Sequence, residues 1–330
     1  MKTAKIALAG SPNVGKSTVF NVLTGMRQHT GNWSGKTVAT AEGKFMYGGK
    51  EIHLVDLPGT YSLVTDSAEE EVARDFLCFE DFDGAVVVCD ACSLERNLIF
   101  ATQVAQLVPN TLLCVNMMDD ARKKGVEINI AELSKETGLP AIGISAAAKE
   151  GMDELEKMIF ELAEGKASAD FVPVRYPKAV QKAAEKVLSV LAGKYGRGGM
   201  FAVLRLLEKE AGFTSAFEKH YGKICDDMDL STALAEAEKE LLAEGFSAEK
   251  VAEKAALCTA FRAEEICLSA VRQRGCAGLR DEKIDAVLTG GKTGFLVMIL
   301  LFAFVFWLTV SAANYPSQLL FGIFEQSEKA

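Results

Sequence analysis

The amino-acid sequence predicts an α/β domain, then an all-α helical domain, then a single membrane-spanning helix. In the first 165 residues short apolar runs alternate with longer stretches of helical periodicity, which is typical of an α/β sheet. From residue 177 to about residue 273 apolar residues recur at helical spacing. Residues 295–313 contain no charged side chain. We therefore expect domains at 1–165 and 166–280, and a membrane segment at 281–330.

Local patterns predict the elements of the first domain. Short apolar runs predict strands at residues 6–9, 51–56, 85–89, 111–115 and 141–145. Helices are expected to begin near Lys16, to run from about Arg96 to Leu107, and to span residues 151–163.

The second domain is expected to contain several helices, because breaks at Gly196-Arg-Gly-Gly199, Gly222 and Gly245 interrupt its apolar periodicity. The acidic runs at 69–71 and 264–265 are interpreted as solvated helix faces, a commoner origin than a metal site. The pair Cys89 and Cys92 has no second pair or nearby histidine, which argues against a zinc or redox site.

The uncharged stretch 295–313 is long enough to cross a bilayer, since 19 helical residues span roughly 28 Å. A buried core helix is the alternative, but such helices usually keep one polar side. Arg280, Lys283 and Lys292 precede the stretch, whereas only Lys329 follows it. By the positive-inside rule we expect the N-terminal domains in the cytoplasm and the helix in the cell membrane.

Composition limits the function further. The 330 residues are 49% hydrophobic and 25% charged, which excludes a disordered chain. The net charge of −9 disfavours nucleic acid as a partner. Most of the eight cysteines have apolar neighbours and no secretory signal follows Met1, as expected of a protein in a reducing compartment.

A phosphate-binding loop follows the first predicted strand. The pattern G-x-x-x-x-G-K-[ST] is matched between a strand and a helix, where backbone N–H groups and the helix N-terminus can hold phosphate oxygens. Lys16 supplies a positive charge, and the Ser17 hydroxyl is a candidate ligand of Mg²⁺. The candidate nucleotide-binding residues here are Gly10, Ser11, Pro12, Asn13, Val14, Gly15, Lys16, Ser17 and Thr18.

A second motif ends the strand at 51–56. The Asp56 carboxylate can hold the Mg²⁺ shell, and the Gly59 amide can approach the terminal phosphate. The candidate residues of this motif are Asp56, Leu57, Pro58 and Gly59.

Two further motifs predict the base. Asp119, after an apolar strand, can accept two hydrogen bonds from guanine, whereas adenine would leave its carboxylate unpaired. A loop thirty residues later suits a backbone contact to the guanine oxygen. The candidate base-binding residues are Asn116, Met117 and Asp119, with Ser145, Ala146 and Ala147. Their order behind a phosphate loop predicts GTP and GDP as ligands and GTP hydrolysis as the activity.

Further segments extend the pattern beyond the nucleotide motifs. They are residues 31–38, 56–63, 72–76 and 94–98, together with a Met at position 117 where most GTPases have Lys. With these segments the sequence closely resembles the cytosolic part of the FeoB-type ferrous iron transporters, and the resemblance covers essentially the whole chain. It implies a Ras-like P-loop GTPase domain, a helical domain that modulates nucleotide binding, and the first membrane helix.

The resemblance also implies residue roles. Thr37, after Gly35 and Lys36, matches the switch threonine that ligates Mg²⁺, with Thr40 as the alternative. Asn13 matches the asparagine through which potassium-activated members place K⁺ beside the phosphates. Together with Lys16 and Gly59, Asn13 and Thr37 are the candidate catalytic residues.

The chain departs from the expected pattern in two respects. Thr60 stands where many small GTPases have a water-orienting Gln, so slow hydrolysis is expected. The family's membrane domain has many helices, and one is visible here. We therefore expect either a fragment or a variant that needs a partner chain.

The function predicted from the sequence is GTP hydrolysis that regulates or drives ferrous iron transport at the cell membrane. The partners implied are the remaining transporter helices or a partner chain, ferrous iron as the transported ion, and further copies of this chain. The alternatives are a ribosome- or tRNA-associated GTPase and a module whose hydrolysis only times a gate.

Overall fold

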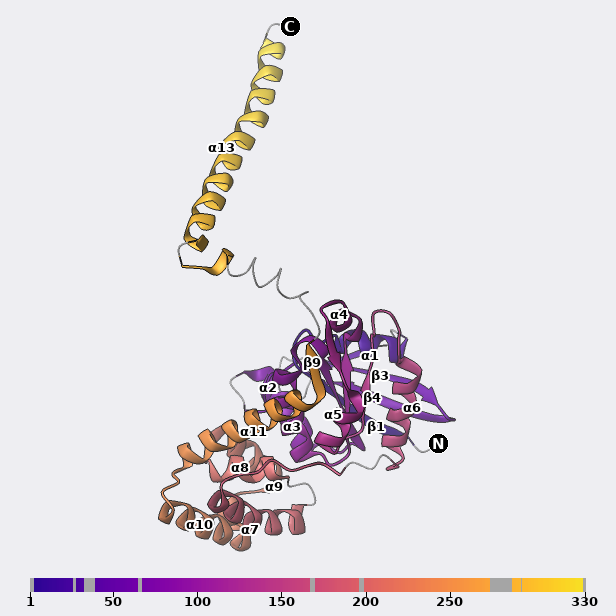
Figure 1. Ribbon diagram of the computed structural model, residues 1–330, viewed down its shortest axis with the longest axis vertical. Coiled ribbons are helices and arrows are strands. Elements are labelled where there is room, and N and C mark those ends of the chain that lie inside the picture. The colour runs from indigo at the N-terminus through magenta and orange to yellow at the C-terminus, as the bar shows by residue number, and fades with distance from the viewer. Residues whose placement is uncertain are drawn as a thin grey trace. The chain divides into compact units, whose positions relative to one another are not determined.

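The computed structural model describes residues 3–25, 28–32, 39–64, 67–166, 170–195, 199–273, 287–291 and 293–328. They belong to two compact units, residues 1–273 and 274–330 (Figure 1). The predicted fold class is confirmed: an α/β sheet is followed by a set of helices and by one long apolar helix.

A seven-stranded sheet with the order β2-β3-β4-β1-β5-β6-β8 forms the centre of the first unit. Its strands are β1 Ala4–Gly10, β2 Gln28–Asn32, β3 Ala39–Tyr47, β4 Lys50–Asp56, β5 Gly84–Asp90, β6 Thr111–Asn116 and β8 Ala141–Gly143. β1 is parallel to β4 and β5, and β6 is parallel to β5 and β8. The carboxyl ends of these five strands therefore meet at one edge of the sheet, where α/β proteins bind ligands.

Both faces of the sheet are buried, because neighbouring residues of a strand point to opposite sides. Ile6 and Leu8 pack with Phe20 of α1 and Ile159 of α6. Ala7 belongs to the opposite core, which includes residues of α2 and α3. The helices of this region are α1 Lys16–Thr24, α2 Ala68–Phe79, α3 Leu94–Leu107, α4 Met118–Lys123, α5 Ile130–Thr137 and α6 Met152–Ala163, with the 3₁₀ turn η1 Ala91–Ser93.

The helices after residue 177 share one hydrophobic core with the α2–α3 face of the sheet. Figure 1 shows α7, α8, α9 and α10 lying together, with α11 running from them toward the sheet. Their bounds are α7 Lys178–Tyr195, α8 Met200–Leu207, α9 Ala211–Tyr221, η2 Ile224–Asp226, α10 Met228–Ala243 and α11 Ala248–Ala270. Gly222 and Gly245 follow the ends of α9 and α10, as their sequence positions predict. The predicted domain boundary at residue 165 stays a prediction.

The structure corrects one expectation about strands. The sequence predicted no strand after residue 165, but β9 Val271–Gln273 pairs antiparallel with β7 Val126–Ile128. Both strands have three residues and lie far apart in the sequence, so no local pattern reveals their pairing. The prediction also lacked β2, β3 and β7. β3 lacks a clean apolar alternation and is held by its pairing with β2 and β4.

The second unit contains the helix α13 Thr293–Glu328. Its stretch Thr293–Val310 has a mean hydropathy of 2.5 and is not buried within the structure. By length and composition it is the one helix of the described residues that could cross a membrane. The predicted span 295–313 lies within α13.

Candidate functional site

The loop between β1 and α1 contains backbone conformations that favour its particular residues. Asn13 and Gly15 have φ values of +65° and +80°, and asparagine and glycine are the residues that adopt this region most readily. A Cβ atom on Gly10 would lie 2.6 Å from the Val88 carbonyl oxygen, and one on Gly15 would lie 2.4 Å from Asn116 Nδ2. The two motif glycines are therefore required by the packing of the loop against β5 and β6.

Lys16 and Asp56 form an ion pair at the carboxyl ends of β1 and β4. The Lys16 ammonium also donates to the Leu57 carbonyl oxygen. Only 9% of Lys16 is exposed, so the charge is held in a mostly buried position. Burial raises the pKa of Asp56, and the positive charge of Lys16 opposes that shift. A cation and a carboxylate thus lie together at the N-terminus of α1.

The segment after Asp56 packs alongside the phosphate loop. Leu57 N donates to Leu8 O at 3.0 Å, and Thr60 N donates to Gly10 O at 3.2 Å. A Cβ atom on Gly59 would lie 3.3 Å from Pro12 Cα, so the backbones approach closely here. The buried Thr60 hydroxyl donates to the Ser62 carbonyl oxygen at 2.5 Å. The same hydroxyl lies 3.3 Å from Glu70 Oε1, so neighbouring groups of the chain already hold it.

Asn116 connects the phosphate loop to the loop after β8. Its Nδ2 donates to Val14 O at 3.0 Å, and its Oδ1 accepts from Ala146 N at 3.0 Å. Both bonds are buried, and Asn116 itself is only 3% exposed. The neighbouring Met117, with φ +65°, places its methyl group against Gly15. One side chain therefore fixes the relative positions of three of the predicted binding segments.

Asp119 is held by the same loop. Ser145 Oγ donates to Asp119 Oδ1 at 2.8 Å and accepts from Asp119 N at 2.9 Å. The hydrogen bond from Ser145 is the main reason that the pKa of Asp119 is lowered. The side chain stays 30% exposed, with Oδ2 3.4 Å from Lys123 Nζ. The carboxylate is thus ionised, oriented and accessible to hydrogen-bond donors.

Known proteins resemble this chain in sequence and in fold. Residues 4–159 match the family of ferrous iron transport protein B. The chain is 42% identical over 188 residues to the Fe(2+) transporter FeoB of Campylobacter jejuni. The aligned region covers 56% of this chain and 30% of that protein. Among solved structures, the cytosolic domain of the T. maritima FeoB iron transporter in apo form is 30% identical to this chain, with a TM-score of 0.65. The superposition covers 82% of this chain and 100% of that domain.

The chain belongs to the FeoB family. The GDP form of the same T. maritima domain gives a TM-score of 0.67 at 29% identity, covering 82% of this chain and 100% of that one. The matched region spans less than a third of the length of the C. jejuni FeoB.

The FeoB-type metal assignments fall partly on described residues. Ser17 lies in the first turn of α1 and Asp56 ends β4, and both offer the hard oxygen atoms that Mg²⁺ prefers. Among the described residues, no group of three or more His, Cys, Asp and Glu side chains could hold a metal ion. Two hard oxygen donors beside a phosphate loop fit an ion whose remaining ligands are phosphate oxygens and water. Gly35, Lys36 and Thr37 lie outside the described residues, and Thr40 lies on β3 opposite Gly31.

The contacts by which α3 holds the segment after Gly59 were not predicted from the sequence. Gln103 Oε1 accepts from Leu63 N at 2.8 Å and from Ser62 Oγ at 3.2 Å. The Arg96 guanidinium lies 3.9 Å from the centre of the Tyr61 ring. Gln103 is 40 residues from its partner in the sequence, and helical periodicity alone gives no sign of this contact.

Proposed function

We propose that this protein binds guanine nucleotides and hydrolyses GTP to GDP and phosphate at the sheet edge formed by β1, β4, β6 and β8. The observation that supports this most strongly is the bridge made by Asn116 beside the ionised, accessible carboxylate of Asp119. Membership of the FeoB family and the likeness to a GDP form of a relative add support. The comparisons offer no support for the alternative of a nucleic-acid-linked GTPase.

Each residue of the site has a distinct role in this proposal. The backbone N–H groups of residues 10–17 hold the phosphate oxygens, and Lys16 exchanges its carboxylate partner for them. Asp119 accepts from guanine, while Met117 covers the base plane. Ser17, Asp56 and Thr37 would hold Mg²⁺, and Asn13 would hold K⁺; both ions supply positive charge that stabilises the phosphates during transfer. Because Thr60 replaces glutamine, the attacking water is poorly oriented and hydrolysis is slow.

Base selection tests the nucleotide assignment. GTP should bind at least about a thousandfold more tightly than ATP, as expected when the wrong base leaves a polar group unpaired. Asp119→Ala should abolish this preference and leave the free energy of unfolding nearly unchanged, because the side chain is partly exposed. Titration calorimetry with both nucleotides measures the ratio. Equal affinities for GTP and ATP in the unsubstituted protein would rule the guanine assignment out.

Cation choice tests the role of Asn13. Its side-chain oxygen lies in the phosphate loop and is of the type that hard cations prefer. Replacing Na⁺ by K⁺ should increase the rate of GTP hydrolysis, and Asn13→Ala should remove the difference. A rate that is the same with either alkali cation would contradict the assignment.

For the whole protein we infer a membrane-bound role in ferrous iron transport, with the nucleotide site in the cytoplasm and Thr293–Val310 as a membrane span. The transport path would be formed with further helices or a partner chain, because a single apolar helix offers no shielded polar groups for an ion. In proteoliposomes that hold this chain with its partner helices, Fe²⁺ uptake should require GTP and should stop in Lys16→Ala. Uptake that continues with GDP alone would oppose the proposed coupling.

A further inference from the structure

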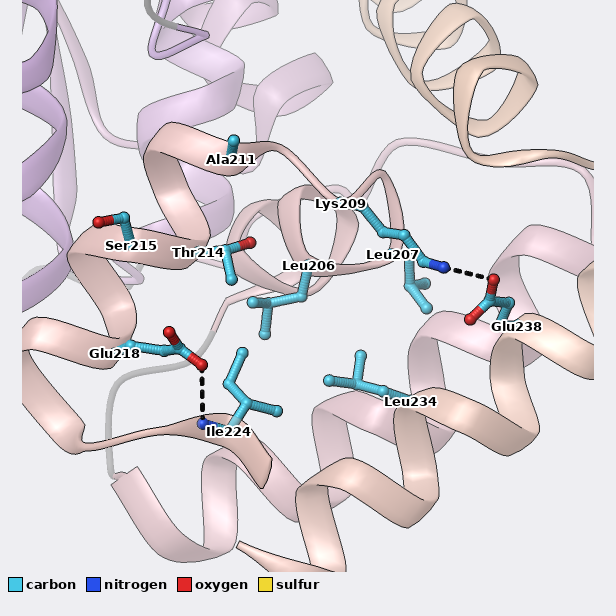
Figure 2. A pocket seen from close by; sticks show the side chains of 10 residues that line it. All are labelled: Leu206, Leu207, Lys209, Ala211, Thr214, Ser215, Glu218, Ile224, Leu234 and Glu238. Atoms are coloured by element: carbon cyan, nitrogen blue, oxygen red, sulfur yellow. Dashed lines mark hydrogen bonds and ion pairs between the residues drawn. The ribbon is translucent and has the colours of Figure 1, made fainter. Parts of the chain in front are cut away.

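A cavity of about 450 Å³ opens between α8, α9, η2 and α10, away from the nucleotide site. Figure 2 shows aliphatic side chains at its centre and polar groups at its edges. The aliphatic residues are Leu206, Leu207, Ile224 and Leu234. A volume of this size lies within the range of small-molecule sites, which are mostly apolar with a few placed polar groups.

The two ends of the cavity differ in charge balance. At one end Lys209 Nζ donates to Glu238 Oε1 at 2.5 Å, which neutralises that carboxylate. At the other end Glu218 Oε1 accepts from Ile224 N at 3.1 Å. No ion pair is formed by Glu218 within the part of the chain that the structure describes. The apolar cavity therefore has one compensated carboxylate and one that lacks a cationic partner.

We propose that this cavity binds an organic cation: a protonated amine attached to an apolar body. The apolar body would fill the space among Leu206, Ile224 and Leu234, and this burial supplies most of the affinity. The ammonium group would meet the Glu218 carboxylate, with the Thr214 hydroxyl on the same wall as a further acceptor (Figure 2). This ligand would pair with the half-buried Glu218 carboxylate and cover the aliphatic surface at once.

An anionic ligand fits the same cavity less well. Among the described residues that line it, Lys209 is the cation, and its ammonium is already bonded to Glu238. An anion would have to break that pair and would approach two carboxylates at short range, which is unfavourable. The proposed ligand is also unrelated to the nucleotide, because the cavity is built from α8, α9, η2 and α10 rather than from the sheet edge.

Three probes of one shape test the charge preference: 4-phenylbutylamine, 4-phenylbutanol and 4-phenylbutyrate. The full chain is held in nanodiscs of zwitterionic lipid and saturated with GDP, so that the nucleotide site is blocked and the lipid surface is neutral. Binding is measured by saturation-transfer NMR, with empty nanodiscs as the blank. The amine, which is protonated at neutral pH as lysine is, should bind at least about tenfold more tightly than the alcohol and the acid.

Matched variants locate the binding. Glu218→Gln keeps an oxygen for Ile224 N but removes the charge, and it should reduce amine affinity to that of the alcohol. Glu264→Gln, an exposed residue of α11, makes the same charge change elsewhere and should have no effect. Leu234→Phe should fill the cavity and weaken all three probes. Tighter binding of the acid, or unchanged amine binding in both Glu218→Gln and Leu234→Phe, would overturn the proposal.

Discussion

The sheet edge and the α8–α10 region belong to one compact unit, yet they are built differently. At the edge, polar side chains bond to backbone atoms of neighbouring loops, as Asn116 bonds to Val14 O and Ala146 N. In the helical region, aromatic rings and ion pairs dominate, as around Phe213, which lies 6.0 Å from Phe79 and 6.5 Å from Phe201 between ring centres. The first arrangement fixes the positions of candidate binding groups, and the second packs the helices around a shared core.

Arg74 of α2 lies between the sheet and the helical region. It is buried, bonds to Asp75 Oδ1 at 2.7 Å and reaches Glu210 Oε1 at 3.4 Å. Its guanidinium lies 5.8 Å from the centre of the Phe213 ring. Arg74 therefore connects α2, which follows the segment after Gly59, to residues of the helical region. Substitutions in the sheet edge and in the helical region can therefore test whether nucleotide binding and stability depend on different residues.

The largest expected effect is on the helical side. Phe213 is fully buried, so Phe213→Ala should lower the free energy of unfolding by about 4 kcal/mol through lost burial and the cavity left behind. Urea unfolding of the full chain in detergent micelles measures this loss. The preference for GTP over ATP should stay unchanged at low urea. A loss of base preference in this variant would show that the two regions are not separable.

A smaller effect is expected from pH. Burial raises the pKa of Glu208 from its ordinary value of 4.5 to about 7, although Arg205 opposes the shift. The folded chain therefore binds the proton more tightly than the unfolded chain, and its stability decreases as the pH rises from about 4.5 through 7. Between pH 5.5 and pH 8 this carboxyl should lower the free energy of unfolding by about 2 kcal/mol.

Glu208→Gln isolates that contribution. Burial also raises the pKa of Asp56. In the wild-type protein this second carboxyl also makes the free energy of unfolding decrease as the pH rises. The variant should keep the contribution of Asp56 and lose that of Glu208. Its free energy of unfolding should therefore depend less steeply on pH than that of the wild type. Urea midpoints at pH 5.5 and pH 8 measure the difference. Equal slopes in the two proteins would mean that Glu208 titrates near its ordinary value when folded.

The same contrast explains what could be predicted from the sequence. The strands that position the edge are short apolar runs, and their predicted ranges 6–9 and 111–115 fall inside β1 and β6. The edge motifs are local, so their residue types indicate phosphate and guanine binding directly. Gln103, Arg74 and the pairing of β9 with β7 depend on contacts between distant segments. Periodicity predicts that α8 and α9 are helices, but not that a cavity lies between them and α10.

The smallest expected effect on stability comes from α3, which lies between the sheet edge and the helical region. Gln103→Leu keeps the volume of the side chain but leaves Leu63 N buried without its acceptor. The loss of this bond and of the one from Ser62 should lower the free energy of unfolding by about 1.5 kcal/mol. Because these bonds hold the segment after Gly59, we also expect GTP hydrolysis to slow several-fold.

Gln106→Leu is the matched control for that prediction. Gln106 is buried on the same helix and donates to the Tyr176 hydroxyl at 2.9 Å, on the side facing the helical region. Its substitution should cost a similar free energy of unfolding and leave the rate of GTP hydrolysis unchanged. Urea unfolding and phosphate release on the same preparations separate the two effects. If both variants slow hydrolysis equally, the slower rate results from lost stability and not from loosening of the segment after Gly59. The two regions would then not be distinct at α3.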